Sequence, residues 1–464
     1  MSGYYQWGIA LMAAGLFCFA QAGTGRVDLP DGLVLRPHVY GHLEGGQIES
    51  GSLNKDAAGK YNASNYKIDH VWTEDAYISL GLDADYMDHL RLQFALDTKL
   101  YFSYPILNDA RYTKNMRQDV GIGELCAKYY LGRADSPAFL VQAGYFKYKY
   151  NPDVRNLGEY MFRTGTYPIY YDMGFDFPMA RLLGLRAGTN LFKSLKLDVL
   201  MSSATVYPSM NWSLAGVASY DVAAIHFIDI GAGIDFAHLF DVYTAHSFPL
   251  FGGDPTTPSS DQINQRYISG GDTLWYTFKG TKVMGRISID PKAFLKFDFF
   301  GENDCKLYAE ADIIGLKNYP DSGVTQGGVW DLVAPSYNKI LEKMPVAIGF
   351  NIPTFKVLDI LNFEFEWCGT KYYNDASNVI NKGSSPIPYD VQNQLSDPNA
   401  PVKRHTKWSL YAKKSFCKGH IAITGQVARD HIRLPCAAYD IEMNNELMVE
   451  KKDWWWMLKT SWMF

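Results

Sequence analysis

The stretch from His89 to Phe102 reads HLRLQFALDTKLYF and alternates apolar with polar side chains. Its apolar face carries Leu90, Leu92, Phe94, Leu96, Leu100 and Phe102, and its polar face carries Arg91, Gln93, Asp97 and Lys99. A period of two indicates a β-strand with two different faces. The stretch exceeds the five or six residues of an average soluble strand and is long enough for a tilted strand that crosses a bilayer. We therefore expect one face against lipid and the other against water.

The same alternation recurs along the chain, for example over residues 228–236, 282–290, 305–315 and 361–369. All such segments together predict about sixteen strands, near residues 33–43, 70–82, 89–102, 119–131, 138–150, 181–192, 195–206, 212–220, 227–237, 274–289, 305–316, 344–353, 361–370, 406–416, 420–431 and 453–464. The predicted fold is all-β, a transmembrane antiparallel up-and-down β-barrel with apolar residues outside and charged residues inside.

The composition excludes several other classes of protein. Apolar residues make up 47% and charged residues 20% of the 464 residues, which excludes a disordered chain. No run of 18 apolar residues occurs, which excludes a bundle of transmembrane helices. The 44 basic and 49 acidic residues give a net charge of −5, so we expect no nucleic-acid partner. Aromatic residues reach 15% and accompany 40 glycines, a mixture typical of barrels with aromatic girdles.

The N-terminal residues have most features of a secretory signal peptide. Residues 8–20 read GIALMAAGLFCFA, and Ala20-Gln21-Ala22 forms a small-x-small cleavage site. Residues 1–7 lack the usual Lys or Arg, and the alternative is a buried N-terminal helix. We predict a signal peptide over residues 1–22 and a single transmembrane β-barrel domain over residues 23–464.

The connections between the predicted strands alternate in length. Long polar loops cover residues 44–69, 103–118, 151–180, 238–273, 317–343, 371–405 and 432–452. Short connections lie between them, although the one at 291–304 is longer than a turn and the outer one at 207–211 is short. Short periplasmic turns and long outer loops are typical of outer-membrane barrels, and a soluble barrel has no reason to sort its loops in this way.

The chain ends DWWWMLKTSWMF, an alternating strand whose last residue is Phe464. Trp462 and Phe464 resemble the C-terminal assembly signal of bacterial outer-membrane barrels, in which the last strand ends in Phe. The mature chain is similar in organisation to the sixteen-stranded porins of Gram-negative bacteria. This resemblance implies a bacterial outer-membrane location, contact with outer-membrane lipid, recognition by the outer-membrane assembly machinery and passage of small polar solutes. It leaves a monomer and a homo-oligomer both open.

The third long loop, residues 151–180, corresponds to the porin loop that folds into the barrel and narrows the pore. The resemblance therefore implies a constriction that carries Arg155, Glu159, Arg163, Asp172 and Asp176. The period of two places further charges in the lumen, at Arg91, Asp97, Lys282, Arg286, Glu310 and Glu364. The loop is also rich in Tyr and Phe, so it packs against either the barrel interior or a neighbouring subunit. The alternative is a surface loop with scattered charges.

We expect an outer-membrane channel for passive diffusion of small polar solutes such as ions or sugars. We expect no enzyme activity, because no nucleophile elbow, zinc-protease, Walker or dinucleotide motif is present. The histidines are scattered, and no cofactor or metal site is predicted. The alternative function is that of a non-transporting outer-membrane barrel, such as an adhesin, a secretion-system component or a structural protein.

Overall fold

A computed structural model describes residues 25–52, 67–103, 117–133, 136–162, 179–191, 194–203, 212–222, 227–240, 266–269, 272–275, 280–294, 297–316, 323–326, 329–332, 340–369, 405–432, 448 and 451–464. The predicted signal peptide, residues 1–22, lies outside these ranges. Within them, no helix is long and apolar enough to cross a membrane.

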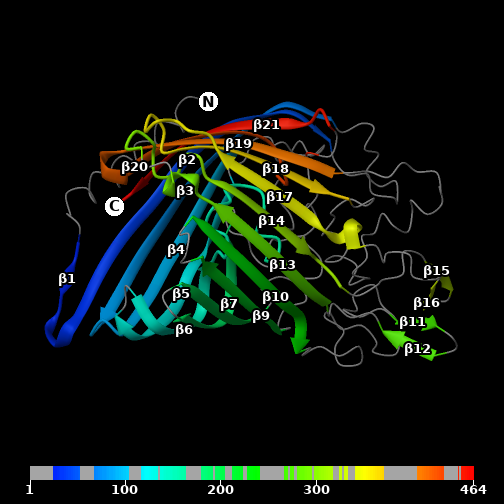
Figure 1. Ribbon diagram of the computed structural model, residues 1–464, viewed down its shortest axis with the longest axis horizontal. Helices are drawn as coiled ribbons and strands as arrows, with labels where there is room; N and C mark the ends of the chain where they lie inside the picture. The colour runs from blue at the N-terminus through cyan, green and yellow to red at the C-terminus, as the bar shows by residue number, and fades with distance from the viewer. Residues whose placement is uncertain are drawn as a thin grey trace.

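Sixteen antiparallel strands form a closed barrel, which is seen from the side in Figure 1. They are β2 (Leu33–Ser52), β3 (Lys67–Tyr86), β4 (Leu90–Ser103), β5 (Arg117–Arg133), β6 (Ser136–Tyr148), β7 (Ala180–Leu191), β8 (Leu195–Ser203), β9 (Trp212–Asp221), β10 (Ile228–Phe240), β13 (Gly280–Ile289), β14 (Leu307–Ile313), β17 (Pro345–Asn351), β18 (Ile360–Cys368), β19 (His405–Phe416), β20 (Ile421–Arg429) and β21 (Trp454–Met463). Each strand pairs with the next one in this order, and β21 pairs back with β2. The predicted fold and strand number are therefore confirmed.

The strands differ from the prediction mainly in length. β2 and β3 stay paired as far as Ser52 and Lys67, well beyond the predicted ends at residues 43 and 70. The alternation is weak in the extension of β2, EGGQIESGS over residues 44–52, because the ladder of backbone hydrogen bonds continues where lipid no longer imposes an apolar face. The predicted strand 274–289 overlaps two elements, the end of β12 (Asp272–Trp275) and the whole of β13.

Several small elements lie outside the barrel wall. β1 (Val27–Asp28) pairs with β2, and β11 (Arg266–Ser269), β12, β16 (Val329–Leu332) and β15 (Gly323–Gln326) form a separate four-stranded sheet. The 3-10 helices are η1 (Pro30–Gly32), η3 (Pro291–Ala293), η4 (Ile340–Lys343) and η5 (Cys417–Gly419). Most of the small sheet arises from connections that the sequence predicted as polar loops, at residues 238–273 and 317–343, and the end of β12 falls in the predicted strand 274–289. Figure 1 places the sheet beyond the barrel end opposite the C-terminus.

The two faces of the wall follow the predicted period of two. The outward side chains Leu92, Phe94, Ile230, Ile287 and Phe365 are all exposed. In the β13–β14 ladder, Arg286 faces Glu310 and both are buried, while the neighbouring Ile287 points away from the lumen. An apolar outer surface on a closed barrel is what a bilayer requires, so this is an outer-membrane β-barrel with lipid outside and charged groups inside.

The last strand closes the barrel at the end that carries the short turns. The backbone N–H of Phe464 donates to the Val39 carbonyl at 2.9 Å, and the Val39 N–H donates to the Phe464 carbonyl at 2.8 Å. Trp462 covers Gly41 of β2, where an added Cβ atom would lie 2.6 Å from the indole ring. Glycine at position 41 is therefore needed for this aromatic contact across the closing seam.

Candidate functional site

After β6 the chain turns into the barrel and forms the inserted segment, residues 149–162. Leu157 and Tyr160 pack against Ala347, whose side chain points inward from β17. Met161 and Phe162 join a buried apolar cluster with inward side chains of β5–β10 and β13. The aromatic residues of this part of the loop thus contact the barrel interior, one of the two partners that the sequence allowed. The described part of the loop lies within the lumen.

Glu364 of β18 holds the middle of the inserted segment. Its carboxylate accepts the backbone N–H groups of Arg155 at 2.6 Å, Asn156 at 2.8 Å and Leu157 at 2.8 Å. The hydroxyl of Tyr308 donates to the same carboxylate at 2.5 Å. Three successive N–H groups that face one anion satisfy donors that a non-helical buried chain would otherwise leave unpaired. Hydrogen bonds to a charged acceptor are also stronger than neutral ones.

Glu310 of β14 holds both ends of the inserted segment. It accepts the Tyr150 hydroxyl at 2.7 Å, the Asn151 side-chain amide at 2.6 Å and the Tyr160 backbone N–H at 3.1 Å. Glu310 is buried, so these three donors replace the water that its carboxylate loses. The two ends of the segment are thereby fixed to one point of the wall.

Glu159 closes the inserted segment upon itself. Its carboxylate accepts the backbone N–H of Asn151 at 2.5 Å and that of Tyr150 at 3.4 Å. Burial and the nearby charge of Glu310 raise the pKa of Glu159 well above its ordinary value. Glu159 and Gly158 have φ angles of 59° and 103°, which mark the tight reversal in the chain.

Further polar contacts fix the inserted segment along its length. The Tyr160 hydroxyl donates to Glu366 of β18 at 2.5 Å, and Lys282 of β13 donates to the Met161 carbonyl at 3.0 Å. Three more pairs connect the segment and its anchors to the barrel: Asn156 with Asp430 at 2.5 Å, Asp153 with Lys306 at 2.7 Å and Glu366 with His431 at 2.8 Å. We call strands β13, β14, β17 and β18 the segment-bound wall.

The charges of strands β2–β8 pair mainly with each other, and we call these strands the ion-pair wall. Asp85 lies 2.5 Å from Arg91 and 2.7 Å from Arg36. Two further pairs, Asp97 with Arg181 at 2.6 Å and Asp198 with Arg186 at 2.8 Å, lie on the same wall. The arginines of the first group are partly exposed, so these charges contribute to the field inside the barrel.

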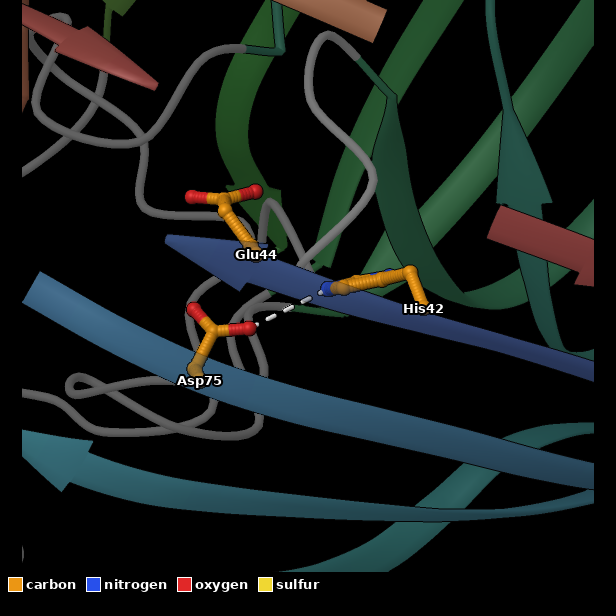
Figure 2. A group of neighbouring side chains, drawn as sticks. All are labelled: His42, Glu44 and Asp75. Atoms are coloured by element: carbon orange, nitrogen blue, oxygen red, sulfur yellow. Dashed lines mark hydrogen bonds and ion pairs between the residues drawn. The ribbon is translucent and has the colours of Figure 1, made fainter. Parts of the chain in front are cut away.

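A histidine and two carboxylates meet on this wall, as Figure 2 shows. His42 Nε2 lies 3.2 Å from Asp75 Oδ1, and one ligand atom from each of His42, Glu44 and Asp75 lies within 4.8 Å of the others. Two lysines neutralise the carboxylates, because Lys99 lies 3.0 Å from Asp75 and Lys459 lies 3.6 Å from Glu44. This charge balance favours a salt-bridge network over a metal site.

The predicted site residues fall into three groups. Glu310, Glu364 and Lys282 point inward and bind the inserted segment, whereas Arg286 points inward and pairs with Asp229 at 2.6 Å. Arg91 and Asp97 lie on the ion-pair wall, and Arg155 and Glu159 lie in the segment. Arg163, Asp172 and Asp176 lie outside the described residues.

Sequence reasoning missed several contributors to this site, namely Tyr150, Asn151, Asn156, Tyr308 and Asp430. The first four have glutamate partners that the alternation had already turned inward, whereas Asp430 accepts from the Asn156 side chain. The inward glutamates were therefore the available signal, although they did not identify their donors. Tyr308, for example, shares the inward face of β14 with Glu310. The partner choice depends on the path of the inserted segment, which has no periodicity.

Known proteins were compared with the sequence and with the fold. No family model matches the sequence, and no curated protein sequence is similar to it. Among solved structures, OmpF of Salmonella typhi in complex with daunomycin is similar, with 11% identity and a TM-score of 0.46 over 95% of this chain and 100% of that chain. OprB of Pseudomonas putida has 10% identity and a TM-score of 0.47 over 94% of each chain. The channel DcaP of Acinetobacter baumannii has 11% identity and a TM-score of 0.43 over 94% of this chain and 99% of that chain.

Proposed function

We propose that this outer-membrane barrel is a channel for passive diffusion of small polar solutes, in which the inserted segment narrows the lumen. The observation that carries the proposal is the attachment of residues 155–157 to Glu364 inside the barrel. A non-helical chain at membrane depth must line a cavity or be buried in protein. The remaining cross-section between the segment and the rest of the wall is the proposed path.

Charge sets the expected selectivity of this path. Arg91, Arg36 and Lys99 of the ion-pair wall face the lumen, together with Asp75 and Asp85. A narrow water-filled pore with low-dielectric walls focuses the field of such charges. Closely spaced groups of both signs favour polar solutes over apolar ones, which supports ions or sugars as the solute class.

Planar-bilayer recording tests the proposal. Purified protein should give stable single-channel steps, and the variant with Glu310→Gln and Glu364→Gln should give larger and noisier steps because the segment loses its charged acceptors. The matched control is Glu44→Gln on the ion-pair wall, which should keep the step size of the wild-type protein. Heat-modifiable migration on gels verifies that each variant has folded.

A correctly folded barrel that gives no conductance would overturn the channel proposal. The non-transporting alternative, an adhesin, secretion-system component or structural barrel, would then be favoured by the four-stranded sheet of β11, β12, β15 and β16, which lies beyond the barrel wall. That sheet offers two edge strands, β12 and β15, within the described residues.

We also propose that Trp462 and Phe464 form the signal read by the outer-membrane assembly machinery. Their place at the closing seam supports this role, because the barrel closes only when β21, the last strand, pairs with β2. Deletion of Phe464 should lower the yield of heat-modifiable barrel in cells while refolding in detergent micelles remains efficient. Equal losses in both settings would show that the residue acts on stability alone.

A further inference from the structure

Two turns at the short-turn end of the barrel form one structured unit, the turn platform. It consists of residues 290–294 and 297–306 between β13 and β14, and residues 352–359 between β17 and β18. Asp304 connects the two turns, because its carboxylate accepts the backbone N–H groups of Gly301 at 2.7 Å, Phe355 at 3.0 Å and Thr354 at 3.1 Å. Burial alone would raise the pKa of Asp304, but these donors hold it below its ordinary value.

The turn platform displays phenylalanine rings on its surface. Phe297, Phe299 and Phe355 are 54%, 51% and 55% exposed, and Val357 is 71% exposed. The ring centroids of Phe297 and Phe299 are 5.2 Å apart, and those of Phe299 and Phe355 are 5.8 Å apart. A contiguous apolar patch of this kind marks a surface that meets something other than water.

The backbone of the platform is held in an unfavourable conformation. Phe355 and Lys356 have φ angles of 55° and 67°, a left-handed geometry that non-glycine residues rarely adopt. The Asp304 hydrogen bonds and a bond from Lys356 Nζ to the Asp298 carbonyl maintain it. Strained backbone that the surroundings enforce is often associated with a functional surface.

The second turn of the platform is attached to the end of β19, partly through an outward-facing side chain. Lys414 shares the outward face of β19 with Leu410 and Phe416, both exposed, and it donates to the Lys356 carbonyl at 3.0 Å. The Ser415 backbone N–H donates to Asp359 at 2.6 Å, which fixes the second turn against the same strand end.

The apolar outer wall continues into the platform. Leu307, Phe350 and Phe363 are paired across β14, β17 and β18 next to the two turns, and all three are exposed on the lipid face. Aromatic girdles of outer-membrane barrels flank the apolar band at both interfaces, and the platform rings lie on the turns just beyond the strand ends.

We propose that the turn platform is a phospholipid-binding surface that inserts Phe297, Phe299 and Phe355 into the periplasmic leaflet. The continuity with the lipid-facing wall points to lipid as the occupant. Lys356 donates to an uncharged backbone carbonyl, so its ammonium charge remains available to a lipid phosphate. The rings would occupy the glycerol and upper acyl region, which suits aromatic side chains at a membrane interface.

Fluorine relaxation in nanodiscs tests this proposal. A fluorinated phenylalanine is placed singly at position 297, 299 or 355, and the nanodiscs contain phosphatidylethanolamine and phosphatidylglycerol. A nitroxide on the upper acyl chain should broaden these signals as strongly as the signal of a label at Phe365 on the lipid-facing wall. A water-soluble gadolinium chelate should have a much smaller effect on them.

Stronger broadening by the chelate than by the lipid nitroxide would overturn the proposal. The same holds if the labels at all three positions are protected from both reagents, because a second copy or another protein would then cover the patch. A second measurement uses the variant with Phe297→Ser, Phe299→Ser and Phe355→Ser. Native mass spectrometry should show fewer retained phospholipids than in the variant Phe240→Ser, whose ring is 52% exposed at the opposite end of β10. Equal lipid retention would contradict the inference whatever the conductance of the channel.

Discussion

The segment-bound wall and the ion-pair wall use the same kind of residue for different purposes. On the segment-bound wall, Glu364 receives three backbone N–H groups of the inserted segment. On the ion-pair wall, Asp85 receives the guanidinium groups of Arg91 and Arg36. Both carboxylates point inward for the same reason, the alternation of their strands. The difference shows that the alternation of a strand determines only that a charged side chain points into the lumen. The role of that side chain depends on the hydrogen-bond donors that the rest of the chain brings to it.

The donors also decide how much each carboxylate stabilises the protein. Glu364 is 1% exposed, and it accepts three backbone N–H groups at a depth where water does not readily replace it. The arginine partners of Asp85 have side-chain exposures of 28% and 44%, so water can replace the lost contact. We therefore expect the two walls to respond differently to the same kind of substitution.

The largest predicted effect is that of Glu364→Ala. It leaves three buried N–H groups unpaired, which should lower the free energy of unfolding by about 3 kcal/mol or more, since each unsatisfied buried donor costs about 1–3 kcal/mol. Asp85→Ala should cost only about 1 kcal/mol, the upper range for partly exposed ion pairs. Urea unfolding in lipid vesicles measures both values, and equal losses would erase the proposed distinction between the walls.

The sequence predicted the barrel well because lipid imposes a period of two on every strand. All sixteen strands were identified, and outward residues such as Ile287 and Phe365 are exposed as expected. The ends of β2 and β3 were missed, since pairing beyond the bilayer needs only backbone hydrogen bonds. The sheet of β11, β12, β15 and β16 was missed for a related reason: its four-residue strands are too short to show a pattern.

The candidate site was less predictable than the fold. Alternation placed Glu310 and Glu364 inward, but their partners in the inserted segment lie 150 to 209 residues away in the sequence. Contacts such as Asn151 with Glu310 depend on a non-periodic chain path, and the cluster of His42 and Asp75 depends on the register between β2 and β3. Neither the path of the inserted segment nor the register between β2 and β3 can be predicted from a single sequence.

A second prediction compares the two faces of one strand. Leu96→Arg puts a charge on the lipid face of β4, several residues from the short turn, and should cost roughly 2–4 kcal/mol, the range for a charge near the middle of the bilayer. Gln93→Arg puts the same charge in the lumen beside Asp83, whose carboxylate already accepts from Gln93 at 3.2 Å, and should cost much less. Equilibrium unfolding measures both variants, and similar costs would mean that the register of β4 is wrong by one residue.

A third prediction concerns ion selectivity. Arg91→Gln removes a partly exposed positive charge from the ion-pair wall, so the reversal potential in a salt gradient should move toward cation preference. Arg155→Gln should move it in the same direction, because the Arg155 guanidinium donates to the uncharged Pro152 carbonyl and keeps its positive charge. Lys356→Gln on the turn platform is the matched control and should leave the reversal potential unchanged. A shift of equal size in the control would assign the effect to overall charge.

The smallest predicted effect is a pH dependence within the inserted segment itself. The pKa of Glu159 is raised by burial and by the charge of Glu310. Above pH 4.5, the ordinary pKa of this side chain, the folded state therefore keeps a proton that the unfolded state releases. The docking of the segment should therefore weaken as pH rises from about that value through the raised pKa. For Asp153, burial raises the pKa, but the hydrogen bond and charge of Lys306 lower it by more, so the pKa lies below its ordinary value of 3.8. The contribution of Asp153 to docking of the segment is therefore lost only as pH falls through this lowered pKa. Hydrogen exchange at the Leu157 amide, corrected for the intrinsic rate, should show less protection at higher pH, and Glu159→Gln should remove this trend. If protection of the Leu157 amide still falls with pH in Glu159→Gln, another group causes the pH dependence. If the pH dependence disappears in Asp153→Asn, the two carboxyl groups are not independent.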